Sequence, residues 1–494
     1  KIYKGYRTTQ DADWGLSAAF ANRYSTTLKE PVTDRYFTDD VMERAKAFSD
    51  TAVIELSRYS GEFLGDNTQK QQKKYNLPTD TSREYGQIST EEQSLIKLCN
   101  ETFNNVVIVF NCGSMMDMTF LETGRAPDGE EIGRPDAALV AGYLGQSGAS
   151  AIPRIIYGDV NPSAKLADTV VYNPRENELT RYNFTENEAD CVYTEGVYVG
   201  YKFYETAAAE GYYNERTLDG TDKTGYDAVV QYPFGYGLSY TDFSWSVKET
   251  SLTDGSVLEK DDTVTITVTV TNTGDVAGKD VVQLYYAPPY VDGEIEKPAI
   301  SLVDFAKTPT LEPEMSADVT LSFSAYDLAS YDCYDMNKNG YAAWELDESA
   351  AHTLKFMSDA HTPKADMDRD ANAPGGELTY TVTKDIVWTT DPVSGNEVMN
   401  RFTGDTAYLG VPLDGSTLGQ DWTYLTRAAW ADSVCASEYP NLSVNVDDKA
   451  VAYSGYDSVF TEMPPFGVDA GAEYKLVLRA DGTVAQNGDF TNAG

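Results

Sequence analysis

The pattern of hydrophobic residues along this chain changes near residue 243, and this change restricts the possible folds more than any other feature of the sequence. Before that point, apolar residues come in short continuous runs separated by segments that suit helices. After it, apolar and polar residues alternate, as in Thr263–Thr271, where four aliphatic side chains would share one face and five threonines the other. Continuous runs are typical of a mainly parallel sheet, and alternation is typical of half-buried antiparallel strands. We therefore expect an α/β domain followed by an all-β domain.

Three continuous apolar runs mark the predicted parallel strands, at residues 52–56, 106–110 and 138–144. Strands of this composition are expected to be buried on both faces of their sheet. Between the first two, residues 89–92 (Ser-Thr-Glu-Glu) match a capping box, so a helix is expected to begin there and to run toward Phe103.

The second half is expected to form a β-sandwich, because short strands at 263–271, 281–286 and 319–323 are separated by turn residues. Periodic signal weakens beyond about residue 391. The predicted organisation is therefore an α/β sandwich domain with a mainly parallel sheet at 1–240, a β-sandwich at 241–391, and an extended connector at 392–494.

The charge of the chain disfavours polyanionic partners. Acidic residues number 78 against 38 basic ones, a net charge of −40, and no basic block is present. Binding to nucleic acid or to an anionic membrane surface depends on Lys and Arg, so both are disfavoured. No apolar run approaches the roughly 20 residues that a membrane helix requires.

The supply of reactive side chains narrows the chemistry further. His352 and His361 are the only histidines, which disfavours catalytic triads and histidine-built metal sites. The five cysteines are scattered without a CxxC pair, and their odd count favours a reducing compartment. Carboxylates, 35 tyrosines and six tryptophans remain, and this combination suits sugar substrates.

One segment imitates a calcium-binding loop. Asp335, Asn337 and Asn339 place oxygen side chains at the first, third and fifth positions, and Gly340 follows at the sixth. The twelfth position is Leu346, where such a loop uses a bidentate glutamate. The interpretation preferred from the sequence is an Asn-Gly turn, with no metal site and no cofactor.

Residues 57–62 (Ser-Arg-Tyr-Ser-Gly-Glu) directly follow the first predicted strand. In open α/β sheets, ligands are held by loops that leave the carboxyl ends of strands, so Glu62 is a candidate functional carboxylate. Considered alone, Glu62 is a weak candidate, because an acidic loop residue is usually a solvated carboxylate or, here, an ion-pair partner of Arg58.

A resemblance to a known family, which covers the greater part of the chain, favours the functional role of Glu62 over the structural one. The chain resembles the non-barrel region of glycoside hydrolase family 3, the β-glucosidase family. The segments that carry the resemblance, in order, are Ser57–Glu62, Gly158–Leu166, Tyr193–Tyr201, Tyr232–Tyr240 and Asn272–Lys279. The last of these is similar to the opening of the family's fibronectin type III-like domain, which the resemblance assigns to residues 241–391.

The resemblance implies retaining hydrolysis of β-glucosides and β-linked oligosaccharides without a cofactor. It assigns the general acid/base to Glu62, and it suggests Arg58, Tyr59 and Phe63 as substrate contacts. The family's nucleophile belongs to a (β/α)₈ barrel, which is therefore an expected partner within the same enzyme. The sequence leaves a homo-oligomer open.

The connector indicates where that barrel is expected. Residues 400–402 and 424–428 resemble the connector of members with reversed domain order, so the barrel is expected after Gly494. Departures from the family pattern, at Phe63, Ser147 and Ala164, leave subsite details open.

Other functions compatible with the sequence are a β-xylosidase, another exo-glycosidase of the same family, and a non-catalytic carbohydrate-binding or scaffold subunit. If Glu62 is structural, the acid/base would be sought at Glu55, Asp66 or Glu84.

Overall fold

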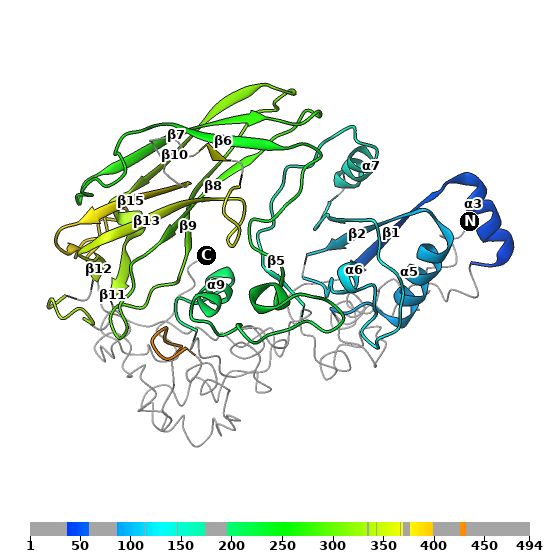
Figure 1. Ribbon diagram of the computed structural model, residues 1–494, viewed down its shortest axis with the longest axis horizontal. Helices are drawn as coiled ribbons and strands as arrows, with labels where there is room; N and C mark the ends of the chain where they lie inside the picture. Colours follow the sequence, from blue (N-terminus) through cyan, green and yellow to red (C-terminus); the bar gives the residue numbers. More distant parts are fainter. Residues whose placement is uncertain are drawn as a thin grey trace, which may run out of the picture. The chain divides into compact units, whose positions relative to one another are not determined.

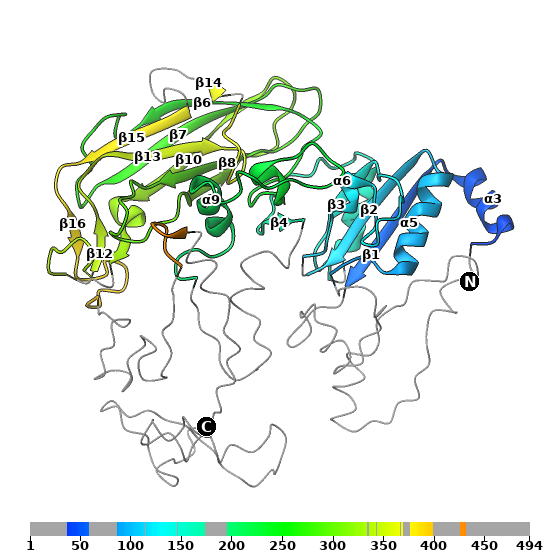
Figure 2. The ribbon, with the colours of Figure 1, turned by 60° about the horizontal axis from the view of Figure 1, so that its bottom comes forward.

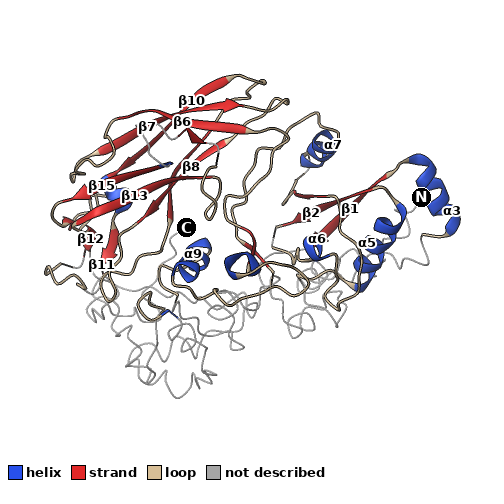
Figure 3. Cartoon of the chain, in the orientation of Figure 1, coloured by secondary structure: helices blue, strands red, loops and turns tan. Residues whose placement is uncertain are grey.

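Figures 1 and 3 show the chain in a computed structural model. The residues that the structure describes are 37–58, 86–113, 115–145, 147–172, 195–332, 335–341, 343–365, 367–368, 376–398 and 425–430. These residues fold as two compact units. In the described ranges, the first unit comprises 37–172 and 213–240, and the second comprises 195–212 together with everything from 241 onward.

The first unit has an α/β order of elements. In chain order, its elements are α3 (Asp39–Phe48), β1 (Thr51–Arg58), α5 (Thr90–Thr102), β2 (Asn105–Cys112), α6 (Phe120–Thr123), β3 (Ala137–Val140), the 3₁₀ turn Gly148–Ser150, α7 (Ala151–Ile156), β4 (Val170–Val171), the 3₁₀ turn Gly225–Ala228 and β5 (Val230–Tyr232).

A three-stranded parallel sheet in the order β1-β2-β3 organises this unit, which confirms the predicted parallel sheet. Helix α5 covers one face, where Ile96 packs among buried residues such as Leu56 and Ile108 (Figure 2). The expected burial on both faces holds only in part. In the central strand β2 the side chains that face α5 are buried, but Val107 on the other face is only partly buried. Val53 of β1 and Val140 of β3 are 50% and 45% exposed. The outer strands have a neighbour on one side only in this sheet, so their side chains are less completely covered.

Helix α5 begins at the predicted capping box. The Ser89 hydroxyl accepts from the Glu92 amide at 3.1 Å, and the Glu92 carboxylate accepts from the Ser89 amide at 2.7 Å. Both bonds satisfy amides that have no partner within the helix. The helix ends at Phe103, as predicted, and the chain then enters β2.

Two of the family-like segments interlock within the first unit. The Asn161 side chain accepts from the Tyr240 amide at 2.9 Å, and Lys165 Nζ donates to the Gly237 carbonyl at 2.8 Å. The backbone of Leu166 bonds residues 235 and 236 in both directions. These segments therefore build the unit, which accounts for their specific residues without a role in chemistry.

The second unit is the predicted β-sandwich. In chain order, its elements are α9 (Tyr201–Ala209), β6 (Phe243–Thr250), β7 (Thr263–Asn272), β8 (Val281–Ala287), β9 (Ser301–Lys307), β10 (Ser316–Ser324), the 3₁₀ turn Ala325–Leu328, β11 (Ser330–Asp332), β12 (Ala343–Leu346), β13 (Ser349–Met357), β14 (Met367–Asp368), β15 (Glu377–Val382) and β16 (Ile386–Trp388).

Its two layers are the sheets β10-β7-β6-β14 and β15-β13-β8-β9. Strand β7 follows the predicted alternation: Val264, Ile266, Val268 and Val270 are all fully buried and face the common core. A smaller sheet, β11-β12-β16, adjoins that core through Leu346. In the described part of the chain, no helix is long and apolar enough to cross a membrane.

Residues 425–430 pack against this second unit. The Trp430 ring meets Tyr198 edge-on, with ring centroids 5.0 Å apart. The Arg427 amide donates to Glu296 at 2.9 Å, and Arg427 Nε donates to Glu210 at 2.5 Å. This part of the predicted connector is thus fixed to the sandwich by a buried ring and a paired guanidinium.

Candidate functional site

The predicted acid/base segment begins at the last residue of β1. Glu62, with the predicted substrate contacts Tyr59 and Phe63, lies outside the described residues, and for Arg58 only the backbone is described. The alternatives Asp66 and Glu84 also lie outside them. The described residues nearest to these positions in the chain are those on either side of the segment.

The three parallel strands end at one edge of the sheet. In the register of the ladder, Ser57 lies opposite Asn111, and Phe110 lies opposite Val140. The residues that follow each strand are consequently neighbours in space. This is the edge at which parallel sheets hold their ligands.

The segment after β1 also returns to this edge. The Asp117 amide, in the stretch that follows β2, donates to the Gly86 carbonyl at 2.9 Å. Gly86 precedes α5, which begins at the same edge because it connects β1 to the parallel β2. Arg58 and Gly86, the described residues before and after this segment, therefore both lie at the carboxyl ends of the strands.

Glu55, the described alternative acid/base, is held by neighbouring polar side chains. Asn111 Nδ2 donates to its Oε1 at 2.6 Å, and Ser57 Oγ lies 3.5 Å from the same oxygen. All three side chains lie on the face of the sheet away from α5. Glu55 is thus a hydrogen-bonded carboxylate within a strand, three residues before the strand ends at Arg58.

Tyr143, which follows β3, lies close to Gly113, which follows β2. A Cβ atom at Gly113 would come within 2.0 Å of the Tyr143 ring, so the ring occupies the space that a side chain at 113 would need. The ring is 64% exposed. An exposed aromatic ring at a ligand-binding edge is a surface on which a sugar ring could stack.

A cleft of about 410 Å³ opens in the same unit and is lined by Ile88, Asp117, Thr119, Phe120 and Arg125, among others. Burial raises the pKa of the Asp117 carboxyl, although the Thr119 amide, which donates to it at 2.9 Å, acts in the opposite direction. The cleft is thus lined by both apolar and polar side chains, and one of its two carboxyl groups, that of Asp117, holds its proton more strongly than usual.

The sequence analysis did not single out Asn111, Tyr143 or Asp117 as site residues. The rule that selected the segment after β1 would have found Asn111, which follows the second predicted strand. It would not have found Tyr143, because the third strand was predicted at 138–144, whereas β3 ends at Val140. Asp117 carries no such signal, because its position depends on the bond to Gly86.

Models of two known domain families match this chain, in the same order as the α/β and β-sandwich parts of the fold. Residues 7–201 match the glycosyl hydrolase family 3 C-terminal domain, and residues 280–345 match a fibronectin type III-like domain.

The chain is similar to curated proteins named as β-glucosidases. It is 32% identical over 380 residues to beta-glucosidase A of Butyrivibrio fibrisolvens, which covers 73% of this chain and 40% of that protein. It is 29% identical over 328 residues to a beta-glucosidase of Ruminococcus albus, covering 66% of this chain and 29% of that protein. The chain therefore spans less than half the length of these relatives.

Solved structures show the same likeness. A beta-glucosidase from Paenibacillus barengoltzii superposes with a TM-score of 0.58 and 25% identity, over 77% of this chain and 34% of that one. Beta-glucosidase 3B from Thermotoga neapolitana, solved with α-D-glucose, superposes with a TM-score of 0.55 and 24% identity, over 78% and 44%. Because this second identity is below 25%, the comparison with Thermotoga neapolitana shows similarity of fold alone.

Proposed function

Because this chain carries the C-terminal domain of glycoside hydrolase family 3 followed by a fibronectin type III-like domain, we propose that it forms part of a retaining β-glucosidase. In this proposal the enzyme removes terminal β-linked glucose from glucosides and oligosaccharides. Glu62 of this chain supplies the general acid/base, and a (β/α)₈ barrel of the same enzyme supplies the nucleophile.

The observation that supports the proposal is the position of the two described residues that bound the segment 59–85. Both lie at the carboxyl edge of the parallel sheet, Arg58 before the segment and Gly86 after it. A carboxylate four residues beyond β1 is then within a short reach of that edge, where a ligand is expected.

The chemistry divides between two carboxyl groups. The barrel carboxylate attacks the anomeric carbon while the Glu62 carboxyl gives its proton to the leaving glycosidic oxygen, and a covalent glycosyl-enzyme forms. The Glu62 carboxylate then takes a proton from water, whose oxygen displaces the nucleophile and restores both groups. Retaining enzymes hold the two carboxyl groups about 5–5.5 Å apart.

Arg58, Tyr59 and Phe63 are proposed to contact the substrate because they flank Glu62 in the chain. Tyr143 is added to this set. Its exposed ring lies at the same edge of the sheet and offers an apolar face to a sugar.

The division of roles is tested by assaying this chain with and without the barrel. The purified chain alone is expected to release no nitrophenol from an aryl β-glucoside, because a single carboxylate leaves no route to the covalent intermediate. Addition of the barrel polypeptide, or joining it to this chain, is expected to give activity that is higher on the β-glucoside than on the matched β-xyloside.

Two results would contradict the proposal. Turnover by the chain with no barrel polypeptide detectable would overturn the division of roles. A higher kcat/KM on the xyloside would replace the glucosidase assignment with a β-xylosidase.

A further inference from the structure

The loop between β11 and β12 holds oxygen side chains in a fixed arrangement. Gly340 N–H donates to Asp335 Oδ1 at 2.9 Å, Asn339 N–H donates to Asn337 Oδ1 at 3.2 Å, and Tyr341 N–H donates to Asn339 Oδ1 at 2.9 Å. The backbone of the loop therefore fixes the orientation of three side-chain oxygens before any ligand is present.

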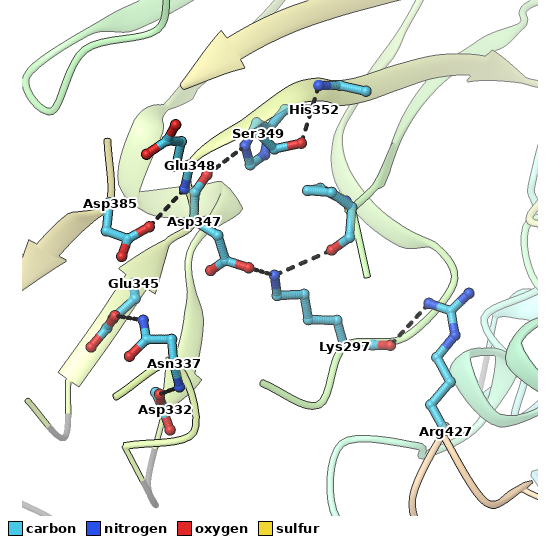
Figure 4. A network of polar contacts seen from close by, with 12 residues as sticks. Lys297, Asp332, Asn337, Glu345, Asp347, Glu348, Ser349, His352, Asp385 and Arg427 are labelled. Carbon is cyan, nitrogen blue, oxygen red and sulfur yellow. Dashed lines mark hydrogen bonds and ion pairs between the residues drawn. The ribbon is translucent and has the colours of Figure 1, made fainter. Parts of the chain in front are cut away.

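Glu345 is directed into this loop from β12. Its side chain is fully buried, and its Oε2 accepts from Asn337 Nδ2 and from Asn339 Nδ2, both at 2.5 Å. Its other oxygen, Oε1, is buried and has no hydrogen-bond partner among the residues that the structure describes. Figure 4 shows Asn337 between Glu345 and Asp332. A buried carboxylate oxygen without a partner is costly, so it points to a ligand that the structure does not contain.

The electrostatic surroundings favour a cation as that ligand. Asp332 is 1% exposed, and its oxygens accept from backbone amides of the loop. Lys297, a buried lysine drawn in the same view, is paired with Asp347.

The fold explains why Glu345 can do what the twelfth residue of a helix-flanked calcium loop does. Here the loop is followed by a strand, in which successive side chains point to opposite faces. Leu346 therefore packs into the hydrophobic core of the sandwich, and Glu345 points the other way, toward the loop. The preference for an Asn-Gly turn assumed that the bidentate glutamate must occupy the twelfth position, as it does in a loop flanked by helices. That spacing does not apply where a strand follows the loop.

We propose that this loop is a Ca²⁺ site. Asp335, Asn337 and Asn339 supply side-chain oxygens, the Tyr341 carbonyl supplies a fourth, and Glu345 Oε1 completes the set. In the described residues, no cluster of three or more His, Cys, Asp or Glu side chains could hold a metal. The proposed site instead combines two carboxylates with neutral amide and carbonyl oxygens, donors that Ca²⁺ accepts readily.

Ca²⁺ fits this donor set better than Mg²⁺. It takes six to eight oxygens in a flexible geometry, whereas Mg²⁺ demands a near-ideal octahedron and keeps several waters. Because only two of the five donors are charged, the expected dissociation constant lies in the range of about 10⁻⁶ to 10⁻³ M.

Binding is measured on the full chain after removal of divalent ions with EDTA. Tb³⁺ luminescence, excited through Trp344 or Tyr341 and competed with Ca²⁺, is expected to report one site per chain in the presence of excess Mg²⁺. Saturating Ca²⁺ is also expected to raise the unfolding temperature, because it binds the folded state only.

Two variants test the assignment, and one serves as a matched control. Glu345→Gln and Asp335→Asn each remove one ligand charge with little change of shape, and each is expected to weaken Ca²⁺ binding at least about tenfold. Glu397→Gln removes an exposed carboxylate of the same unit and is expected to leave the affinity unchanged.

Absence of stoichiometric binding to the wild-type chain would overturn the proposal. So would unchanged affinity in the two ligand variants, or an equal loss in Glu397→Gln, which would indicate diffuse binding to an acidic surface. Asp335 is only partly buried, so Asp335→Asn decides the matter if Glu345→Gln does not fold.

Discussion

His352 lies fully buried in the second unit with both ring nitrogens bonded. Its Nε2 lies 2.9 Å from the Asp347 carbonyl, and its Nδ1 lies 2.8 Å from the Tyr286 hydroxyl. A carbonyl can only accept, so Nε2 carries the proton and the tyrosine hydroxyl donates to Nδ1. Burial is the main cause of a lowered His352 pKa, and Lys297 lowers it further, against the opposing effect of Asp347.

This lowered pKa predicts a loss of stability in acid. The unfolded state, with a histidine pKa of about 6.5, binds a proton before the folded state does as the pH falls. The contribution of neutral His352 is therefore complete above about pH 6.5, and below it the free energy of unfolding falls by up to about 1.4 kcal/mol per pH unit until the folded pKa is reached.

Urea unfolding of the wild type and of His352→Gln between about pH 5 and 8 measures this component as a difference. The component is expected to vanish in His352→Gln and to persist in His361→Gln, which removes the only other histidine. An identical pH slope in the wild type and in His352→Gln would show that His352 titrates normally in the folded state.

At the scale of secondary-structure elements, the sequence predicted the helices and strands that have a local sequence pattern. The capping box located α5, and alternation located β7. The signal failed for β13, where His352 shares the buried face with Leu354 and Phe356 and breaks the apolar alternation. It failed for α9 because five successive residues of that helix are buried, which leaves no amphipathic period.

At the candidate site, too, features with a local sequence signal could be predicted, whereas features that depend on contacts between distant segments could not. The rule for strand ends selected the segment 57–62 because it follows the first predicted strand, and the structure describes this segment as far as Arg58, the last residue of β1. The position of Gly86 at the same edge depends on a contact between segments far apart in sequence, which no local pattern contains. The position of the Tyr143 ring close to Gly113 likewise depends on the register in which β3 pairs with β2.

The interlocked segments of the first unit predict unequal effects of two glycine substitutions. A Cβ atom at Gly237 would lie 2.5 Å from the backbone oxygen of Ala164, which cannot move without disturbing the interlock. Gly237→Ala is expected to reduce the free energy of unfolding by about 1–3 kcal/mol.

Gly113→Ala is the matched control, because its obstacle is the exposed ring of Tyr143, which can swing outward. Its expected cost is below about 1 kcal/mol. Denaturant unfolding of both variants measures the difference, and an equal cost would mean that the close approach at Gly237 is relieved without strain.

At the scale of the whole molecule, the described structure assigns most family-like segments to architecture. Segments 158–166 and 232–240 hold the first unit together, and Tyr198 with Trp430 fixes part of the connector to the second. The segment 57–62 differs from these, because it starts at the carboxyl edge of the parallel sheet, where ligands are expected, and carries a carboxylate. The central claim is therefore that Glu62 is the general acid/base of the enzyme to which this chain contributes.

The measurement that tests this claim most directly compares Glu62→Ala on two substrates, in the enzyme that contains both this chain and the barrel. A poor leaving group needs the acid, and general acid catalysis contributes about 10²- to 10⁴-fold, so cellobiose hydrolysis is expected to fall by that factor. Glycosylation by dinitrophenyl β-glucoside, whose phenolate leaves unaided, is expected to fall far less. Added azide is expected to restore turnover and to yield β-glucosyl azide.

Arg58→Ala and Glu55→Gln are the controls, and neither is expected to show azide rescue. The account would be contradicted if both substrates declined equally in Glu62→Ala, azide had no effect, and Arg58→Ala gave the same result. Glu62 would then hold the loop in place, and the proton donor would lie elsewhere.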